Sequence, residues 1–326
     1  MPELRLGIAG LGSAGKRRLS AAVAHPRVRV VATADPDVTP AALGHDGLLH
    51  HGDVDALLHR DDLDAVVVSL PNHLAAPVTA AARARGWAVL CEKPPARDAT
   101  ELRGVLGPGP VLRYGFNHRL HHAPAAARER VARLGALRAV DGIYQRAWLA
   151  KPGDWRLDHA RSGGGILLDQ GIHLVDLVSW LAGPLELVSA AASASAVHPR
   201  LEDHVDAELT TQGVPVRLRS SARGAPRFAL RIEGTRGTLE LVGLATSSSQ
   251  YAPETLRATW ADGPDEVLEW RDDPSWSLEM DSFVRHVLDG DDDGHGCPAE
   301  ALAALELVDQ LRAALPLPPS ELRSAS

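Results

Sequence analysis

A glycine-rich turn constrains this chain more than any other feature of its sequence. Gly10, Gly12 and Gly15 follow an apolar run at 4–9 and precede an alanine-rich stretch, and Asp35 lies twenty residues beyond Gly15. A strand, a G-x-G-x-x-G turn, a helix and an acidic residue at that distance form the signature of a dinucleotide-binding βαβ unit. An ordinary strand-to-helix turn without a ligand is the alternative, and the position of Asp35 makes it the less favoured interpretation.

Each position of this turn has a role in holding a dinucleotide. The first glycine allows a tight turn, the second lets the backbone approach a pyrophosphate, and the third lets helix and strand pack closely. Ser13 and Ala14 begin the helix, whose N–H groups would point at the phosphates. The Asp35 carboxylate would accept hydrogen bonds from a ribose diol and repel a 2′-phosphate. We therefore expect NAD as the cofactor, while Arg17 and Arg18 leave NADP as the less favoured choice.

The first third of the chain alternates short apolar runs with alanine-rich stretches of helical spacing. Near-continuous apolar strands separated by helices are typical of a parallel sheet that is covered on both faces. Strands are predicted at 4–9, 28–34, 65–70, 88–91 and 111–116, and helices at 13–24, 75–85 and 98–106. The fold class expected for this part is therefore α/β, a Rossmann doubly wound parallel sheet over residues 1–117.

Beyond residue 117 the pattern changes to that of an α+β domain with an open, mostly antiparallel sheet. Residues 205–210 and 214–219 alternate apolar and polar side chains at period two. Further strands are predicted at 137–148, 228–233, 238–243, 255–261 and 266–270, and helices at 122–134, 165–182, 275–289 and 299–314. We assign residues 118–315 to this second domain and expect 316–326 to be a disordered tail.

Composition excludes several classes of protein. The 326 residues carry a net charge of -8, which disfavours a nucleic-acid partner, and their two cysteines support neither a disulfide framework nor a zinc site. We see no apolar run of the ~18–20 residues that span a bilayer and no basic-then-apolar leader. A soluble, cytoplasmic protein without membrane attachment is expected. Three neighbouring histidines, His118, His121 and His122, do not present a complete ligand set, so no metal is expected.

Lys93 is one of only three lysines among 34 basic residues. It follows the predicted strand at 88–91 in the sequence Glu92-Lys93-Pro94-Pro95, so it lies where an open α/β sheet binds ligands, beyond the carboxyl ends of its strands. The prolines would keep the following backbone stiff. A lysine on a surface turn is the alternative, but its place favours a functional role.

Asp169, His173 and Asp176 form a polar stripe on an otherwise apolar helix, at spacings of i, i+4 and i+7. Ionisable groups in such a helix cost free energy unless they are paired or face a polar cavity. A structural His–Asp pair is one interpretation. A carboxylate beside a histidine in a cleft, an arrangement that tunes a general acid or base, is the one we favour.

These motifs together resemble the Gfo/Idh/MocA family of nicotinamide-dependent oxidoreductases. The resemblance rests on the glycine turn, Asp35, Pro71-Asn72, Glu92-Lys93-Pro94, and the stretch 162–176. It implies that Pro71, Asn72, Glu92 and Lys93 bind the cofactor. It also implies a catalytic set in which His173 takes the hydroxyl proton, Lys93 hydrogen-bonds the same oxygen, and Asp169 positions the substrate or tunes the histidine. Which of Lys93 and His173 holds the proton stays open.

Two weaker segments are candidates for substrate binding. Asn117 and Arg119 leave the last strand of the first domain, and the resemblance makes them a substrate-side segment. Trp155 and Arg156 suit a sugar face or a phosphate. Either pair could equally brace the two domains. The chain departs from the family in carrying Ala75 where a histidine is usual, with His73 nearer.

The resemblance implies a dehydrogenase that acts on a secondary hydroxyl of a sugar, most consistent with a nucleotide-linked or amino-sugar precursor of antibiotic biosynthesis. Its catalytic alternative is an NAD-dependent glycosidase of the same superfamily, and its non-catalytic alternative is an NAD-binding regulator. The family's use of the second sheet as a subunit interface implies a homodimer or homotetramer.

Overall fold

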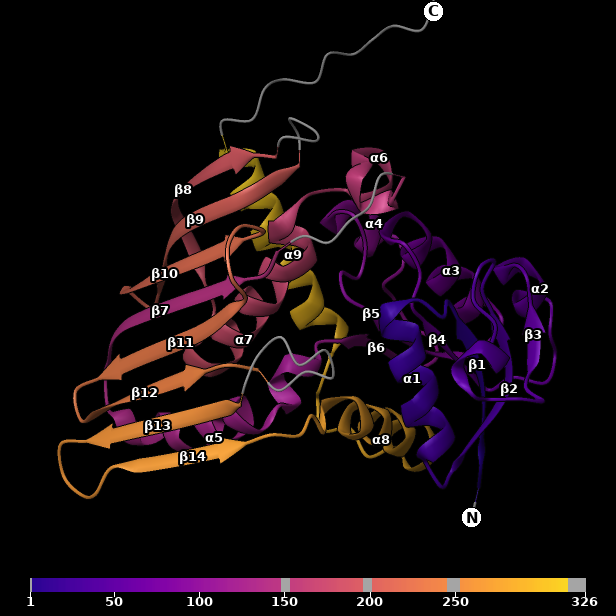
Figure 1. The fold of residues 1–326 in the computed structure, drawn as a ribbon, viewed down its shortest axis with the longest axis horizontal. Coiled ribbons are helices and arrows are strands. Elements are labelled where there is room, and N and C mark those ends of the chain that lie inside the picture. The colour runs from indigo at the N-terminus through magenta and orange to yellow at the C-terminus, as the bar shows by residue number, and fades with distance from the viewer. Residues whose placement is uncertain (1, 148–152, 196–200, 245–252, 316–326) are drawn as a thin grey trace, which may run out of the picture.

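The computed structural model describes residues 2–147, 153–195, 201–244 and 253–315. Two sheets dominate the molecule, one for each of the two expected domains, with helices between and around them (Figure 1). The predicted tail at 316–326 and the end of the strand predicted at 137–148 lie outside the described residues. The predicted fold class is confirmed: a Rossmann-like parallel sheet is followed by a mixed, mostly antiparallel one.

The first sheet has six parallel strands in the order β3-β2-β1-β4-β5-β6, the doubly wound arrangement. Its strands are β1 (Leu4–Ala9), β2 (Val28–Ala34), β3 (Leu49–His51), β4 (Ala65–Val68), β5 (Ala88–Glu92) and β6 (Leu112–Gly115), and its helices include α1 (Ser13–Ala24), α2 (Val54–Leu58), α3 (Asn72–Ala84) and α4 (Ala99–Arg103). Sequence analysis missed β3 and α2, because three residues with two histidines and a five-residue helix carry little periodic signal.

The second sheet has eight strands in the order β14-β13-β12-β11-β7-β10-β9-β8. They are β7 (Leu137–Gln145), β8 (Glu186–Ala194), β9 (Glu202–Thr211), β10 (Val214–Ser221), β11 (Arg227–Gly234), β12 (Gly237–Val242), β13 (Glu254–Trp260) and β14 (Glu266–Trp270). All described pairs are antiparallel except β10 with β7. Strand β8 was not predicted, since its alanines and serines do not alternate as a half-buried strand does.

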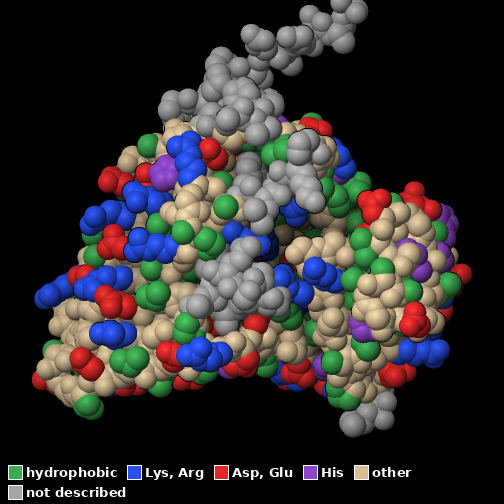
Figure 2. Space-filling view, viewed as in Figure 1, with side chains coloured by type: hydrophobic (Ala, Val, Ile, Leu, Met, Phe, Trp, Pro, Cys, Tyr) green, Lys and Arg blue, Asp and Glu red, His purple; other side chains and the backbone are tan. Residues whose placement is uncertain are grey.

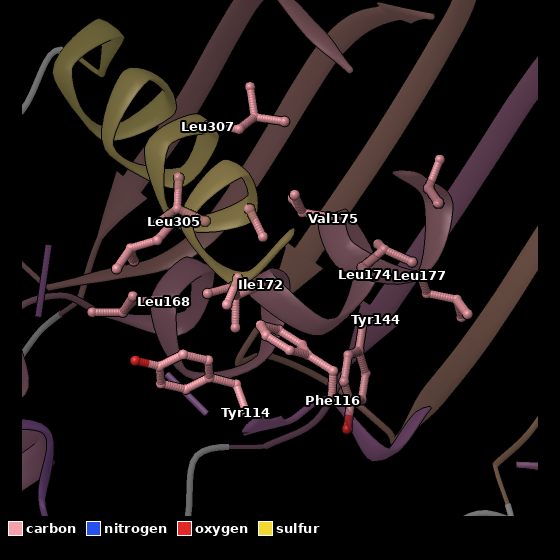
Figure 3. Packing of buried hydrophobic residues seen from close by; sticks show 14 of the residues in the cluster. Tyr114, Phe116, Tyr144, Leu168, Ile172, Leu174, Val175, Leu177, Leu305 and Leu307 are labelled. Carbon is pink, nitrogen blue, oxygen red and sulfur yellow. The ribbon is translucent and has the colours of Figure 1, made fainter. Parts of the chain in front are cut away.

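Helices cover one face of this sheet and leave the other bare (Figure 1). The covering helices are α5 (His122–Arg130), α7 (Ile172–Ala182) and α9 (Pro298–Ala314), which contact β13, β7 and β8 respectively. Ile172 and Leu174 of α7 join Leu305 of α9, Phe116 and Tyr144 in one apolar core (Figure 3). The site residues of the second domain are therefore placed by a densely packed helix.

The helix predicted at 165–182 is divided into a π-helical turn, Leu167–Gly171, and α7. Gly165 lies so close to β9 that a Cβ there would be 2.1 Å from the Glu202 carbonyl oxygen, which explains the glycine run before the turn. By length and composition the stretch His159–Ala182 could cross a membrane, contrary to our reading of the sequence. Because 78% of its most apolar window is buried inside the protein, core packing accounts for its apolarity.

Helix α8 (Ser275–Asp289) returns to the first sheet from late in the chain. Its Met280 and Phe283 are buried in the same core as Leu4 and Leu19, and the helix packs against α1. The boundary predicted at residue 117 remains a prediction, but the core of the first sheet includes side chains from this later helix.

Candidate active site

The glycine turn has the shape that a bound pyrophosphate requires. Gly10 has a φ of +91°, and a Cβ there would lie 2.3 Å from the Ser69 carbonyl oxygen. A Cβ on Gly15 would lie 1.9 Å from the Gly10 oxygen, whereas a Cβ on Gly12 would meet nothing within 4 Å. Two glycines thus bring α1 against the sheet, and the third leaves an open cradle. Helix α1 then begins at Ser13 without a side-chain cap, so its first N–H groups suit an anion.

Asp35 stands at the end of β2 with its carboxylate fixed by three backbone N–H groups. Its Oδ2 accepts from Leu11 at 2.6 Å, and its Oδ1 accepts from Asp37 at 2.9 Å and from Val38 at 2.8 Å. These bonds hold the carboxylate beside the cradle, and Oδ2, which accepts only one of them, keeps a lone pair for a hydroxyl. The residues present therefore fit a nicotinamide dinucleotide.

The turn that carries Lys93 is fixed by a buried ion network below it. Arg18 of α1 is fully buried, and its Nε donates to Glu92 Oε1 at 2.7 Å while its Nη2 donates to Glu279 of α8. Gly115 leaves room for this pair, since a Cβ there would lie 2.8 Å from Arg18 Nη2. His295 Nε2 lies 2.7 Å from Glu279 Oε1. The predicted cofactor residue Glu92 is thus engaged with Arg18.

Burial acts differently on the two carboxyl groups of this network. It raises the pKa of Glu92, against the attraction of Arg18. Burial would raise the pKa of Glu279 too, but Arg18 and His295 outweigh it and hold that pKa below its usual range. Arg18 remains charged because its two carboxylates offset the cost of burying it.

Lys93 and Asp169 bring the two domains together. Lys93 Nζ donates to the Asp169 carbonyl oxygen at 2.5 Å and lies 3.7 Å from its Oδ1. Both side chains keep some exposure, 18% and 24% respectively, so an ammonium group and a carboxylate meet at a surface that a small molecule can reach. Two of the three residues that the resemblance made catalytic are therefore in contact.

His173 is the third, and it is neutral in this setting. Its ring is 5% exposed, and burial lowers its pKa well below the ordinary value, with further lowering by His118 and Lys93. The ring nearest to it is that of His118, whose centroid lies 3.7 Å away. A neutral imidazole is suited to accept a proton. Among the described residues, no group of three or more His, Cys, Asp or Glu side chains could hold a metal ion.

The polar stripe on the helix does not act as one unit. Asp169 meets Lys93, His173 stacks on His118, and Asp176 accepts from Arg119. The expected pairing of His173 with a carboxylate of its own helix is therefore replaced by contacts of the stripe to the turn after β5 and to the segment Asn117–Leu120.

Two predicted substrate residues are engaged inside the protein. Arg119 is 5% exposed, its Nε donates to Asp176 at 2.8 Å, and its Nη1 donates to Glu300 at 2.6 Å. Asn117 Nδ2 donates to Ser275 Oγ at 2.8 Å. These contacts favour the brace that was the alternative for this segment; a substrate contact by either residue remains a prediction.

The remaining predicted residues lie at the edge of this site. Asn72, the first residue of α3, is buried and donates to the Ser162 carbonyl oxygen at 2.7 Å, while Pro71 precedes the helix. Trp155 and Arg156 are half-buried in a short 3₁₀ helix, with the guanidinium 4.4 Å from the indole centroid. No described contact joins that pair to Lys93 or His173.

The sequence pattern did not reveal that Arg18 and His118 are buried next to the candidate site residues. Arg18 shares one face of α1 with Gly15, Leu19 and Ala22, all buried, so its spacing alone could have shown that it points into the protein. Its partner Glu279 lies 261 residues away and left no sequence signal. His118 was considered only as a metal ligand.

Comparison with known proteins gives the same picture over most of the chain. Residues 4–106 match a family model described as an oxidoreductase family with an NAD-binding Rossmann fold, and residues 125–240 match the GFO/IDH/MocA C-terminal domain. The dTDP-3,4-didehydro-2,6-dideoxy-alpha-D-glucose 3-reductase of Streptomyces antibioticus is 30% identical over 96% of this chain and 97% of its own.

Two solved structures share the fold. One is a 3-ketoreductase from Actinomadura kijaniata in complex with TDP-benzene and NADP, with a TM-score of 0.80, 24% identity and coverage of 96% of this chain and 98% of its own. The other is a levoglucosan dehydrogenase in complex with NADH and L-sorbose, with a TM-score of 0.84, 20% identity and coverage of 96% and 97%. At this identity they establish the fold, and they differ from each other in cofactor.

The ion network predicts a specific pH dependence of stability. Replacing Arg18 with Met should lower the free energy of unfolding by about 3–5 kcal/mol near neutral pH, because two buried carboxylates lose their counter-charge. Their folded-state pKa values would then lie above the unfolded ones, so the deficit should shrink as the pH falls through those values. Urea unfolding of the wild type and Arg18→Met at about pH 5 and pH 8 measures this difference in the free energy of unfolding.

The matched control is Arg5→Met, which removes an exposed ion pair with Asp64 in the same domain. We expect little change in stability there. A deficit in Arg18→Met that is the same at both pH values would contradict a role for Arg18 in neutralising the two carboxylates.

Proposed function

Because the chain belongs to the Gfo/Idh/MocA family of nicotinamide-dependent oxidoreductases, we propose that it interconverts a secondary hydroxyl and a ketone of a sugar. Family membership makes it an NAD(P)-dependent oxidoreductase acting on CH–OH groups. The observation that carries the finer proposal is that Lys93 pairs with Asp169 across the domain boundary while the pKa of the buried His173 is lowered by burial, by His118 and by the charge of Lys93.

Each side chain has a separate task in this proposal. When bound, the nicotinamide accepts a hydride from the substrate carbon or returns one to it. His173 takes the hydroxyl proton, because its neutral ring is the available base, and it gives the proton back in the reverse direction. Lys93 donates a hydrogen bond to the same oxygen and stabilises the negative charge that develops there. Asp169 holds Lys93 in place.

The substrate we propose is a nucleotide-linked or amino sugar, and the reaction is a step in the biosynthesis of a modified sugar, as in antibiotic pathways. The similarity to the Streptomyces antibioticus 3-reductase over nearly the whole chain supports this choice. The first experiment follows nicotinamide absorbance with NAD⁺ and NADP⁺ across nucleotide sugars, free sugars and cyclitols. Reduction with a nucleotide sugar supports the proposal. Tight cofactor binding without reduction of it on any substrate would favour a glycosidase or a regulator.

Replacing His173 tests the proton-transfer role. His173→Asn should lower kcat by about 10²–10⁴-fold, the usual contribution of a general base. In the wild type the base is neutral above its pKa, and burial lowers that pKa well below the ordinary 6.5. The contribution of His173 to kcat/KM for oxidation should thus be constant above about pH 6.5 and fall only in more acidic solution.

The control variant is His59→Asn, which changes an exposed histidine of the first domain. Its kcat and pH profile should match the wild type. An acid limb centred at or above the ordinary histidine pKa, or a His173→Asn variant with normal kcat, would remove His173 from the proton-transfer step.

We propose NAD rather than NADP as the physiological cofactor, because the Asp35 carboxylate is fixed beside the cradle. Asp35→Ser should raise the Kd for NAD⁺ by about tenfold or more, since a hydrogen bond to a charged group contributes about 1.5–3 kcal/mol. It should also lower the ratio of the Kd for NADP⁺ to the Kd for NAD⁺, because a 2′-phosphate no longer meets a fixed negative charge. Fluorescence titration measures both constants. Asp37→Ser is the control, and equal changes in the two variants would contradict the assignment.

We propose that a second copy of the chain covers the bare face of the eight-stranded sheet. A groove of about 670 Å³ runs over β7 and β9–β12, and basic and acidic side chains alternate there, including Asp141, Asp206, Arg217 and Arg219 (Figure 2). A surface that carries both signs can be complementary to itself across a two-fold axis. Val242, which also lines the groove, is 53% exposed.

Charge reversal tests this association. Arg219→Glu breaks the 2.6 Å pair with Asp206 and should shift a dimer or tetramer toward monomer in sedimentation equilibrium. Arg5→Glu makes the same change of charge on the first domain and should leave the oligomer intact. A wild type that is monomeric at every concentration would overturn the proposal.

A further inference from the structure

The rings of His118 and His173 lie flat against each other although they come from different parts of the fold. Their centroids are 3.7 Å apart and their planes differ by 9°. His118 belongs to the 3₁₀ helix Asn117–Leu120, just after the last strand of the first sheet, whereas His173 lies in α7. Both are nearly enclosed, with exposures of 6% and 5%. The pair is thus a buried contact at the boundary between the two domains.

His118 is itself held on several sides by rings. Phe228 and His121 meet it edge to face, at centroid distances of 6.4 and 5.5 Å, and Tyr144 lies 5.5 Å away at a tilt. Edge-to-face and stacked contacts fix the plane of an aromatic ring. Because His118 cannot turn within this group, the ring stacked on it is restrained as well.

A histidine that transfers protons is ordinarily oriented by a hydrogen bond to its other ring nitrogen. His173 lacks that bond: its Nδ1 is buried and has no hydrogen-bond partner among the described residues. The carboxylates on its own helix are engaged elsewhere, Asp169 with Lys93 and Asp176 with Arg119. Some other contact must hold the ring if its Nε2 is to point at the reacting oxygen.

We propose that His118 is a positioning residue for His173, and that ring stacking replaces the missing hydrogen bond to Nδ1. The inference rests on the proposed function, in which His173 transfers the proton. His118 does not relay that proton, since imidazole N–H groups lie in the ring plane and parallel rings cannot hydrogen-bond to each other. A flat ring is therefore what this position requires, rather than a second base.

The charges around the pair are consistent with a role through position. His121, which meets the His118 ring edge to face, stands between two acids, with its Nδ1 3.5 Å from Glu254 and its Nε2 3.8 Å from Asp273. Burial lowers the pKa of His118, and the charges of His121, Lys93 and Arg146 lower it further. Burial and these neighbours keep both stacked rings neutral, so neither repels the other while the site awaits its substrate.

Two substitutions of His118 distinguish a role for its flat ring from a role for its titratable nitrogens. His118→Phe keeps the stack and removes both nitrogens, so kcat should stay within about threefold of the wild type. His118→Leu removes the stack, so kcat should fall at least about tenfold while KM changes little, as expected for a misplaced catalytic group. His122→Phe and His122→Leu are the matched controls, because His122 stacks on Trp270 outside this cluster and should tolerate both changes.

The values of kcat and KM in these variants decide between a positioning role, a chemical role and a substrate contact for His118. Equal losses of kcat in His118→Phe and His118→Leu would assign chemistry to the His118 nitrogens and overturn the proposal, and so would normal kcat in both. A matched rise in KM would make His118 a substrate contact instead. If His118→Leu unfolds below the assay temperature, His118→Met supplies a flexible side chain without a ring for the same comparison.

A second measurement needs no substrate. In the free protein the His118 ring should shield the ring protons of His173, so their NMR signals should lie upfield in the wild type and in His118→Phe and move downfield in His118→Leu. Signals that are the same in all three would overturn the stack. If the shift is seen but no sugar is turned over, the proposed function fails while the stacked pair stands.

Discussion

A positive charge in the interior holds the first half of the site in place. Arg18 is fully buried between Glu92 and Glu279, and through them it ties helix α1, the turn that carries Lys93, and helix α8 to one another. Each of these buried charges would cost free energy if it had no partner of opposite charge. The absent side chain of Gly115 provides the space for this arrangement. The glycine cradle before α1 and Lys93 after β5 are therefore held in place by the same buried ion network.

The two candidate catalytic side chains, Lys93 and His173, lie in different environments. Lys93 sits against Asp169 at a partly exposed boundary, where its ammonium charge is supported. His173 is enclosed by rings and is kept neutral. A hydroxyl placed between them would meet a fixed positive charge on one side and an empty proton site on the other. In the reaction we propose, that contrast of environments, rather than either residue alone, is what allows a proton and a hydride to leave the same alcohol.

The sequence predicts what depends on local pattern. Apolar runs and glycines were enough to locate most strands of both sheets, the cradle and Lys93, whereas β3 and β8 were missed because their composition lacks alternation. The sequence could not predict the partners of the polar stripe. The spacing of Asp169, His173 and Asp176 shows that they share a face of the helix, but not which residues lie opposite that face. Arg18 and Glu279 are 261 residues apart in the sequence, so no local sequence pattern includes both.

The return of α8 to the first sheet has a consequence for how the chain is made. Met280 and Phe283 close the same apolar core as Leu4 and Leu19, and Glu279 completes the ion network of Arg18. On the ribosome, the dinucleotide-binding half must wait with part of its core open until almost nine-tenths of the chain has emerged. The second domain needs the still later α9 to cover its sheet, so both domains are completed only near the end of the chain and the two halves of the enzyme mature together.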